Sequence, residues 1–192
     1  MCAAPAKTSD EQVVNAAQRL IARDGVAALS MLAVAKQVGV RAPSLYKRFP
    51  DRDALLDAVA QRTIGELAAQ LIKAGRGRHG AAALKAMARA YRAFAKRSPH
   101  SYMLLYTKRK EHAELRSARA QAVAPVLDAL AELVPKVGDR LPAARVLTAF
   151  LHGFVSMEIE AAFQLGGDVT RAFDYGIDTL LYALDKAAPS VR

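Results

Sequence analysis

Residues 30–49 read SMLAVAKQVGVRAPSLYKRF, and this stretch decides how the first part of the chain folds. The spacing of its apolar side chains predicts two short helices, at Met31–Gln37 and Ala42–Phe49. Two helices that cross at a steep angle need a small residue at the crossing, and Ala35 supplies it. The turn between them needs a residue that tolerates positive φ, and Gly39 supplies it. The pattern therefore predicts a helix-turn-helix.

The second helix of such a pair presents its outer face to a partner. A helix about 10–12 Å wide fits the major groove of B-DNA, and the second helix is the one that enters it. The small core between the two helices is expected from Val34, Val38, Val40 and Leu45. The exposed residues of the second helix are expected to be Arg41, Ala42, Pro43, Ser44, Tyr46, Lys47 and Arg48. The alternative, on these residues alone, is a helical corner with an exposed basic face.

A longer pattern carries a family resemblance. Its members are Gly39-Val40, Ser44-Leu45-Tyr46, Phe49, Arg52 and Leu55-Leu56. Together they resemble the DNA-binding signature of tetracycline-repressor (TetR) type regulators, and the match spans about residues 9–60. The resemblance implies that Ser30 and Met31, at the start of the first short helix, approach the DNA backbone. It also implies that Arg52 binds a phosphate.

Two positions depart from that signature. Arg41 stands where a capping Ser or Thr is common, so a helix cap worth about 1 kcal/mol is lost while a base or phosphate contact is gained. Leu32 stands where many relatives carry an arginine, so one backbone contact is expected to be absent. Both changes affect which operator is bound, and neither threatens the fold.

Helical periodicity continues to the end of the chain, and no stretch alternates for long enough to be a strand. The predicted fold is therefore all-α, with about nine helices. Ser9 with Gln12 fits a capping box, and Asp51 is a good N-cap. Pro125 is expected to kink or break a helix, and Pro135–Pro142 is expected to be a loop. The other helices are expected at about 9–24, 51–73, 81–97, 101–109, 112–134, 143–165 and 171–187.

The resemblance also implies two domains. Residues 7–50 would form a three-helix bundle with the helix-turn-helix, and residues 51–192 a helical domain for ligand binding and dimerisation. The segment Ala143–Leu165 is apolar on several faces, so a partner subunit is expected to cover it and build a two-fold four-helix bundle. The predicted interface residues are Val155, Ala162, Phe173, Ile177, Leu180 and Leu184. Residues 151–158 also resemble a Trp-His-Gly motif of one TetR subgroup, with Leu151 in place of the tryptophan.

The inducer is expected between the helices of this second domain. Predicted lining residues are Met87, Tyr91, Phe94, Tyr102, Met103, Tyr106, Leu127, Phe150, Phe154 and Met157, with His152 and Glu158 as polar anchors. Such walls suit a small, largely apolar or aromatic compound. The same stripe also fits plain core, and His152 also fits a hydrogen-bonded core histidine.

Charge leaves one question open. The formal net charge is +10, and residues 73–119 hold thirteen Lys and Arg against two Asp and Glu. Residues 120–192 are acidic by contrast, with six against nine. The basic region fits an anionic ligand, attraction to DNA or a solvated face equally well.

Several classes of protein are disfavoured. Cys2 is the one cysteine, and the four histidines (His79, His100, His112 and His152) lack metal-ligand spacing, so neither a metal, a cofactor nor catalysis is expected. No run approaches the ~20 apolar residues of a membrane span, and a cytoplasmic protein is expected. A basic protein that coats nucleic acid or membrane nonspecifically is the alternative. The sequence predicts a homodimeric repressor that a small-molecule inducer releases from a palindromic double-stranded DNA operator, with activation as an open variant.

Overall fold

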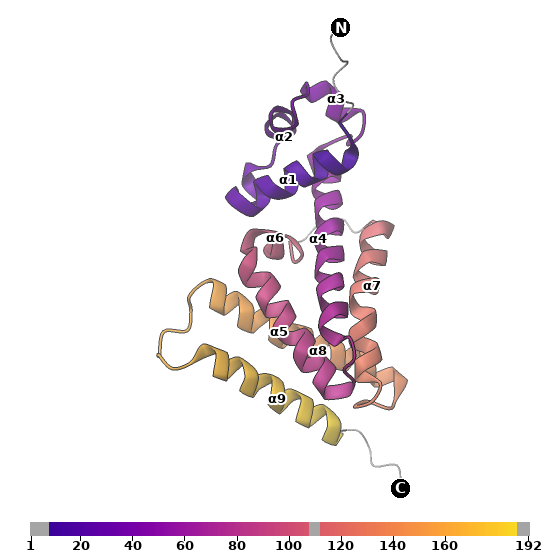
Figure 1. The fold of residues 1–192 in the computed structure, drawn as a ribbon, viewed down its shortest axis with the longest axis vertical. Coiled ribbons are helices and arrows are strands. Elements are labelled where there is room, and N and C mark those ends of the chain that lie inside the picture. Colours follow the sequence, from indigo (N-terminus) through magenta and orange to yellow (C-terminus); the bar gives the residue numbers. More distant parts are fainter. Residues whose placement is uncertain (1–7, 108–111, 188–192) are drawn as a thin grey trace. The chain divides into compact units, whose positions relative to one another are not determined.

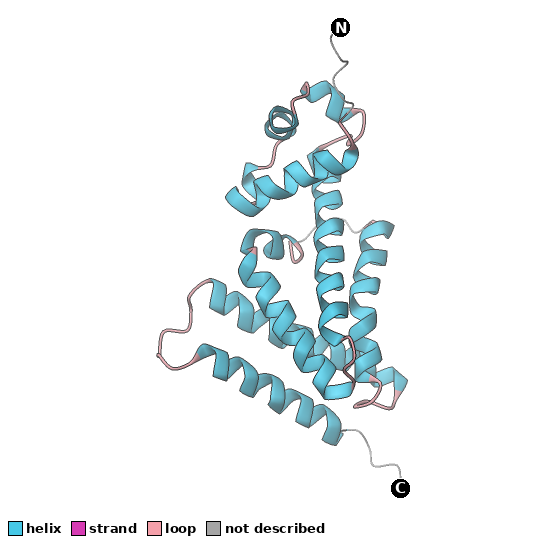
Figure 2. Ribbon diagram, in the orientation of Figure 1, coloured by secondary structure: helices cyan, strands magenta, loops and turns pink. Residues whose placement is uncertain are grey.

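The structure, a computed structural model, describes residues 8–107 and 112–187 (Figure 1). Within these residues all regular secondary structure is helical (Figure 2), which confirms the predicted all-α class with nine α-helices. The helices are α1 (Asp10–Asp24), α2 (Met31–Val38), α3 (Ala42–Tyr46), α4 (Arg52–Gly75), α5 (Gly80–Arg97), α6 (Pro99–Leu104), α7 (Ala113–Leu130), α8 (Val137–Ile159) and α9 (Val169–Ala187), with a 3-10 turn η1 (Val26–Ala28). Cys2 and residue 7, where the first predicted domain starts, lie outside the described residues.

The chain forms two compact units. The first contains residues up to 64 together with 98–115, and the second contains 65–97 together with 116–192, so α4 belongs to both. These units describe packing. The domains predicted at 7–50 and 51–192 describe function, and they stay a prediction.

The first unit is built on α1, which begins at the predicted capping box. The Ser9 amide donates to Gln12 Oε1 at 2.8 Å, and the Gln12 amide donates to Ser9 Oγ at 3.2 Å. One face of α1 is buried, through Val13, Ala16, Ala17, Leu20 and Ile21. The helix α6 packs on α1, where His100 Nδ1 lies 3.2 Å from the Ala22 carbonyl oxygen. A helix distant in sequence therefore completes this unit.

The turn between α2 and α3 is left-handed at Gly39, as predicted. Gly39 has φ of +73° and ψ of 30°, and its amide donates to the Ala35 carbonyl. The Val40 amide donates to the same carbonyl at 3.0 Å. Ala35 and Leu45 are each 1% exposed, which seats α3 against α2. Val40, by contrast, is only half-buried.

An aromatic cluster joins α8 to α9 in the second unit. The rings of Phe150 and Phe154 lie 6.2 and 5.3 Å from that of Phe173, which is fully buried. A Cβ added at Gly176 would lie 2.4 Å from Phe150 Cζ. A larger residue at position 176 would therefore require the Phe150 ring to move.

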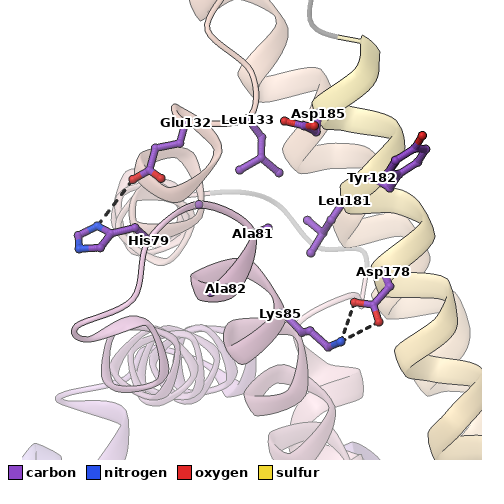
Figure 3. Close-up of a pocket in the computed structure, with 11 residues that line it drawn as sticks. His79, Ala81, Ala82, Lys85, Glu132, Leu133, Asp178, Leu181, Tyr182 and Asp185 are labelled. Atoms are coloured by element: carbon purple, nitrogen blue, oxygen red, sulfur yellow. Dashed lines mark hydrogen bonds and ion pairs between the residues drawn. The ribbon is translucent and has the colours of Figure 1, made fainter.

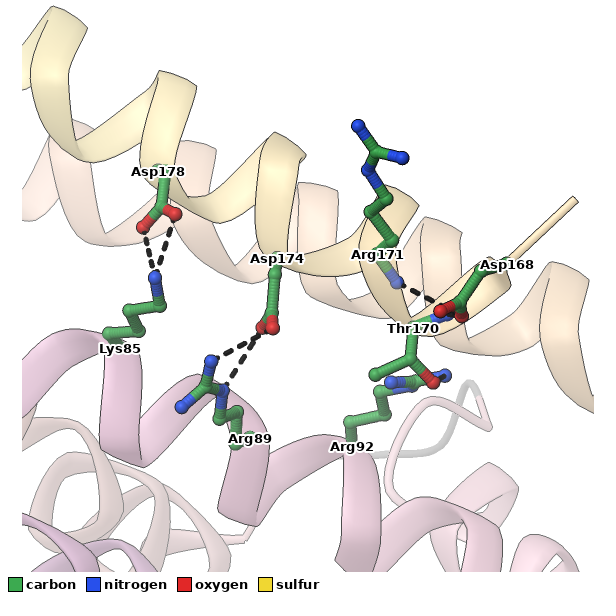
Figure 4. Close-up of polar contacts among 8 residues, drawn as sticks. All are labelled: Lys85, Arg89, Arg92, Asp168, Thr170, Arg171, Asp174 and Asp178. Atoms are coloured by element: carbon green, nitrogen blue, oxygen red, sulfur yellow. Dashed lines mark hydrogen bonds and ion pairs between the residues drawn. The ribbon is translucent and has the colours of Figure 1, made fainter.

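A row of ion pairs joins α5 to α9 (Figure 4). Lys85 Nζ lies 2.6 and 2.7 Å from the two carboxylate oxygens of Asp178. Arg89 donates to both oxygens of Asp174, at 3.0 and 2.8 Å. Part of the basic region at 73–119 is thus neutralised by the acidic C-terminal third of the same chain.

Several predicted boundaries are wrong. Pro135–Pro142 is not a loop, because α8 begins at Val137 and runs through Pro142. Pro142 is the sixth residue of α8, so it removes one intrahelical hydrogen bond that the helix would otherwise have, and α8 continues in spite of this loss. Arg140 also anchors this start, since its guanidinium donates to the carbonyls of Val134 and Pro135 at 3.0 and 2.9 Å. Helix α7 continues past Pro125, so this proline does not break the helix, and the expected kink stays a prediction.

The predicted C-terminal ends of several helices also lie too far along the chain. Helix α3 ends at Tyr46 rather than Phe49, and α8 ends at Ile159 rather than near residue 165. Two residues after α8, Ala161 adopts a φ of +52°, which is outside the helical region. The predicted helix at 101–109 is α6, which starts earlier, at Pro99, and ends at Leu104.

We expect Gly39→Ala to lower the free energy of unfolding by about 1–2 kcal/mol, because a Cβ disfavours the left-handed region. Gly39→Asn should lose less, since asparagine tolerates that region. Gly65→Ala is the matched control: Gly65 lies inside α4 with open space around its Cα, so alanine should stabilise by about 0.5–1 kcal/mol. Urea unfolding followed by circular dichroism measures all three. Equal stability of wild type and Gly39→Ala would contradict the role of this turn.

Candidate nucleic-acid interface

The outward side of α3 carries the predicted DNA-reading residues. Arg41, Pro43, Ser44, Tyr46 and Lys47 are exposed, and Ala42 is half-buried. Tyr46 is 52% exposed although it is a large aromatic side chain. The buried Leu45 holds the opposite side of the helix, so the exposed side chains project from an anchored scaffold.

The N-terminus of α3 lacks a side-chain cap, as expected from Arg41. Arg41 has an extended backbone conformation with φ of −81° and ψ of 140°, and it makes no capping hydrogen bond. Its carbonyl accepts from the Ser44 amide at 2.9 Å. The amides at the start of α3 are therefore not covered by a capping oxygen of Arg41, and its cationic side chain is exposed beside them.

The start of α2 differs in detail from its prediction. Ser30 caps the helix, since its Oγ accepts from the Ala33 amide at 3.1 Å. The side chain of Met31 is 5% exposed, so it belongs to the core of this unit, and only its backbone could face a partner. Leu32, the residue that departs from the resembling signature, is 72% exposed.

Arg48 and Arg52 are both engaged within the first unit. Arg48 Nη1 lies 3.0 Å from Asp10 Oδ1. Arg52 donates from Nε to the Leu29 carbonyl at 2.8 Å and from Nη2 to the Val26 carbonyl at 2.7 Å. Arg52 therefore ties the segment before α2 to the start of α4. No local pattern predicts this role, because the acceptors of Arg52 lie 23 and 26 residues away.

A polar hollow of about 350 Å³ between α1 and α2 was also missed. Its lining residues are Thr8, Gln12, Asn15, Arg19, Gln37 and Val38. The four on the α1 side follow the 4, 3, 4 spacing of one helical face, a signal that was available in the sequence.

The predicted ligand residues fall in both units. Tyr102, Met103 and Tyr106 belong to the first unit, where Tyr102 is fully buried. The others belong to the second: Met87, Tyr91 and Phe94 on α5, Leu127 on α7, and Phe150, His152, Phe154, Met157 and Glu158 on α8. The three on α5 are buried, whereas Met157 is 47% exposed.

The two predicted polar anchors have partners inside the second unit. Glu158 accepts from Arg92 Nε and Nη2, both at 2.7 Å, and from Lys96 Nζ at 2.5 Å. The hydrogen bond from Arg92 holds the pKa of Glu158 below its ordinary value, against the opposing effect of burial. Burial lowers the pKa of His152, whose Nδ1 lies 3.5 Å from Ser156 Oγ. Arg92, which also stacks over the Phe173 ring at 4.9 Å, was missed by the sequence reasoning.

The predicted dimer residues are mostly inward-facing in the single chain. Val155, Phe173 and Ile177 are at most 1% exposed, so they pack within their own subunit. Leu180 and Leu184 are half-buried, and Ala162 is exposed beyond the end of α8. Their role at a dimer interface stays a prediction.

This geometry defines a helix-turn-helix protein attached to a larger helical unit, and comparison with known proteins identifies its family. Residues 13–59 match the model of "Bacterial regulatory proteins, tetR family", and residues 84–180 match "Tetracyclin repressor-like, C-terminal domain". An HTH-type transcriptional regulator of Mycobacterium tuberculosis is 33% identical over 160 residues, which cover 82% of this chain and 73% of that protein. The chain belongs to the tetR family, and it is a DNA-binding transcriptional regulator.

Solved structures agree on the fold. A Rhodococcus sp. RHA1 protein of unknown function superposes with a TM-score of 0.81 at 24% identity, covering 95% of this chain and all of that one. A TetR variant from Acinetobacter baumannii AYE, solved with minocycline, gives a TM-score of 0.72 at 22% identity, covering 96% of this chain and all of that one. None of the helices in the described part of the chain is long and apolar enough to span a membrane.

We expect Arg52→Ala to destabilise the first unit by about 2 kcal/mol, because two carbonyls lose a charged donor. Arg52→Lys should recover part of the loss, since an ammonium group cannot reach both carbonyls with the same fork geometry. Urea unfolding is the measurement. Lys47→Ala is the control: this exposed side chain should change stability by less than about 0.5 kcal/mol. An unchanged stability of Arg52→Ala would remove the structural role assigned to Arg52.

Proposed function

We propose that this regulator is a dimeric repressor that a small molecule releases from a palindromic operator. The observation that carries the proposal is the exposed polar row of α3, held by the Gly39 turn and the buried Leu45. A two-fold dimer would place two such helices about 34 Å apart, which is one turn of B-DNA. We place it in the cytoplasm, where it meets the chromosome, and the proposal includes no catalytic step.

In this proposal the residues of α3 contact either base edges or the sugar-phosphate backbone. Arg41 reads a base edge or a phosphate, Ala42 and Pro43 meet a thymine methyl, and Ser44 reads a base or a phosphate. Tyr46, Lys47 and Arg48 hold the sugar-phosphate backbone. Further contacts with the DNA backbone come from the starts of α2 and α4, through Ser30, the backbone of Met31 and Arg52. Arg52 can make this contact only with donors that its two carbonyl bonds leave unused.

The dimer would form on the outer faces of α8 and α9. Exposed residues recur on α8 at Val146, Ala149, Gly153 and Met157, and on α9 at Ala172, Thr179 and Ala183. Their spacing of three, four or seven residues makes one face on each helix. Small side chains let helices approach closely, so we place the two-fold contact on these rows, with the buried residues Val155, Phe173 and Ile177 supporting them from behind.

The inducer would enter the second unit, in line with residues 51–192 as the sensing domain and residues 7–50 as the reading domain. The aromatic side chains around Phe150 and Phe154 favour a largely apolar or aromatic compound. The Acinetobacter baumannii variant of the same fold was solved in complex with a small molecule, minocycline. Helix α6 belongs to the sensing sequence yet packs on α1, so it offers a route from ligand to DNA.

Operator selection tests the DNA-reading role of Arg41. The wild-type protein should bind a specific site upstream of its own gene, with log affinity falling steeply against log salt concentration because several phosphates are contacted. Arg41→Ser should select a different or less specific site from a random DNA pool. Serine is a good N-cap, so this variant should be at least as stable as wild type.

The matched control is Arg23→Ser, which removes the same charge from the last turn of α1. Its selected site should equal that of the wild type. If Arg41→Ser also selects the wild-type site, Arg41 does not read the operator. Binding that ignores sequence would contradict the proposed function as a whole.

Sedimentation velocity tests the dimer. Gly153→Glu should convert the dimer to a monomer and abolish operator binding, because it places a charge in the proposed contact. A Cβ at Gly153 meets no atom within 4 Å, so the single chain should keep its helical circular dichroism. Gly138→Glu on the same helix also has open space and should remain dimeric. A dimeric Gly153→Glu protein would place the interface elsewhere.

A further inference from the structure

The polar hollow between α1 and α2 holds hydrogen-bond donors that the described part of the chain does not use. It has a volume of about 350 Å³, and its polar lining residues are Thr8, Gln12, Asn15, Arg19 and Gln37. The Gln12 side chain accepts from the Ser9 amide at 2.8 Å, which leaves its NH2 group as a donor. The other four side chains have no hydrogen-bond partner among residues 8–107 and 112–187. The hollow can therefore offer a hydroxyl, three amide NH2 groups and a guanidinium to a bound group.

The charge of this hollow is positive and unbalanced. Arg19 is the one charged side chain among the described residues that line it, and none of them is a carboxylate. All three carboxylates of α1 are paired with other arginines, in the pairs Asp10–Arg48, Glu11–Arg62 and Asp24–Arg23. Arg19 is therefore the cation of α1 that its own helix and the neighbouring helices leave without an anion.

The larger pocket of the second unit differs in this respect. It has a volume of about 650 Å³, and its walls include Glu132, Asp178, Tyr182 and Asp185. The carboxylates of these walls already have partners: Lys85 lies on Asp178 and His79 on Glu132 (Figure 3), and Lys186 lies 3.5 Å from Asp185. That pocket selects no charged ligand, whereas the hollow of the first unit has an unpaired cation among unpaired donors.

These features select a singly charged anion with several oxygen acceptors. A guanidinium binds two phosphate oxygens at once, and amide and hydroxyl donors can reach the others. A phosphate of the DNA backbone carries one negative charge, which Arg19 alone can balance. A free phosphate monoester carries about −1.5 to −2 at pH 7, so it would leave charge unbalanced in this hollow. We propose that the polar hollow binds a phosphate of the DNA backbone.

The position of the hollow connects this contact to α3. Gln37 and Val38 form its α2 side, and they directly precede Gly39, whose left-handed turn leads to Arg41. A phosphate bound here is therefore held beside the turn that sets the direction of α3. Such a contact carries no sequence information, and it fixes the orientation of the first unit on the duplex. It rests on the DNA binding of the family, and on neither the dimer nor the inducer proposed above.

The salt dependence of DNA binding tests this contact through Arg19→Gln. Each phosphate contact contributes about 0.9 to the slope of log affinity against log salt concentration. The variant should reduce the magnitude of that slope by about 0.9 for each bound copy of the chain, measured by fluorescence anisotropy. The loss should be equal on the fragment upstream of the gene and on an unrelated fragment, because the backbone is the same. Asn15→Asp should weaken binding to both fragments as well, because its carboxylate repels phosphate and can pair with Arg19.

Arg171→Gln is the matched control, because it removes the same charge from an exposed arginine of α9 whose side chain points away from α5 (Figure 4). It should keep the wild-type slope. The proposal is overturned if Arg19→Gln keeps that slope, or if Arg171→Gln lowers it equally, which would make the effect one of net charge.

Calorimetry of the DNA-free chain with inorganic pyrophosphate distinguishes a free anion from DNA. Saturable binding that Arg19→Gln abolishes, together with an unchanged salt slope, would assign the hollow to a free anion and overturn the proposal. A wild-type protein that binds both DNA fragments with equal affinity would contradict the proposed repressor. The salt slope of Arg19→Gln would still decide the phosphate contact in that case, because it can be measured on unrelated DNA.

Discussion

The left-handed backbone at Gly39 is the constraint on which the exposed surface of α3, the proposed DNA-reading surface, depends. Helix α3 is only five residues long, and an isolated helix of that length is not stable in water. It persists because the Gly39 turn sets its direction and because Leu45 is buried beneath it. Gly39 and Leu45 therefore determine where the exposed side chains of Arg41, Ser44 and Tyr46 lie.

Some of the charged side chains form ion pairs within the molecule. Lys85, Arg89 and Arg92 belong to the strongly basic region of the sequence, yet they pair with Asp178, Asp174 and Glu158 from the acidic end. Such pairs contribute little stability where they are exposed. The pairs with Asp178 and Asp174 specify how α9 lies on α5, and the pair with Glu158 joins α5 to α8. These pairs leave the formal net charge of +10 unchanged, because that sum already counts both partners.

Local interactions were the predictable part of this structure. The Ser9 capping box, the Asp51 cap, which accepts from the Ala54 amide at 2.7 Å, and the Gly39 turn each involve residues at most four apart. The boundary at Pro142 was wrong because the helix tolerates the lost hydrogen bond, and Arg140 anchors its start by donating to the Val134 carbonyl six residues earlier. The exposed row of α3 was predicted from that segment alone, whereas the burial of Met31 depends on packing.

The amino-acid sequence by itself determined the all-helical class, the helix-turn-helix and the family, because these follow from periodicity and from residue types at fixed short offsets. Only the tertiary structure decided that Arg52 binds the Val26 and Leu29 carbonyls, that α6 joins the first unit, and that Glu132, Tyr182 and Asp185 line one pocket. Each of these contacts joins residues far apart in the chain. Their pairing depends on how the helices pack, and no local spacing encodes that.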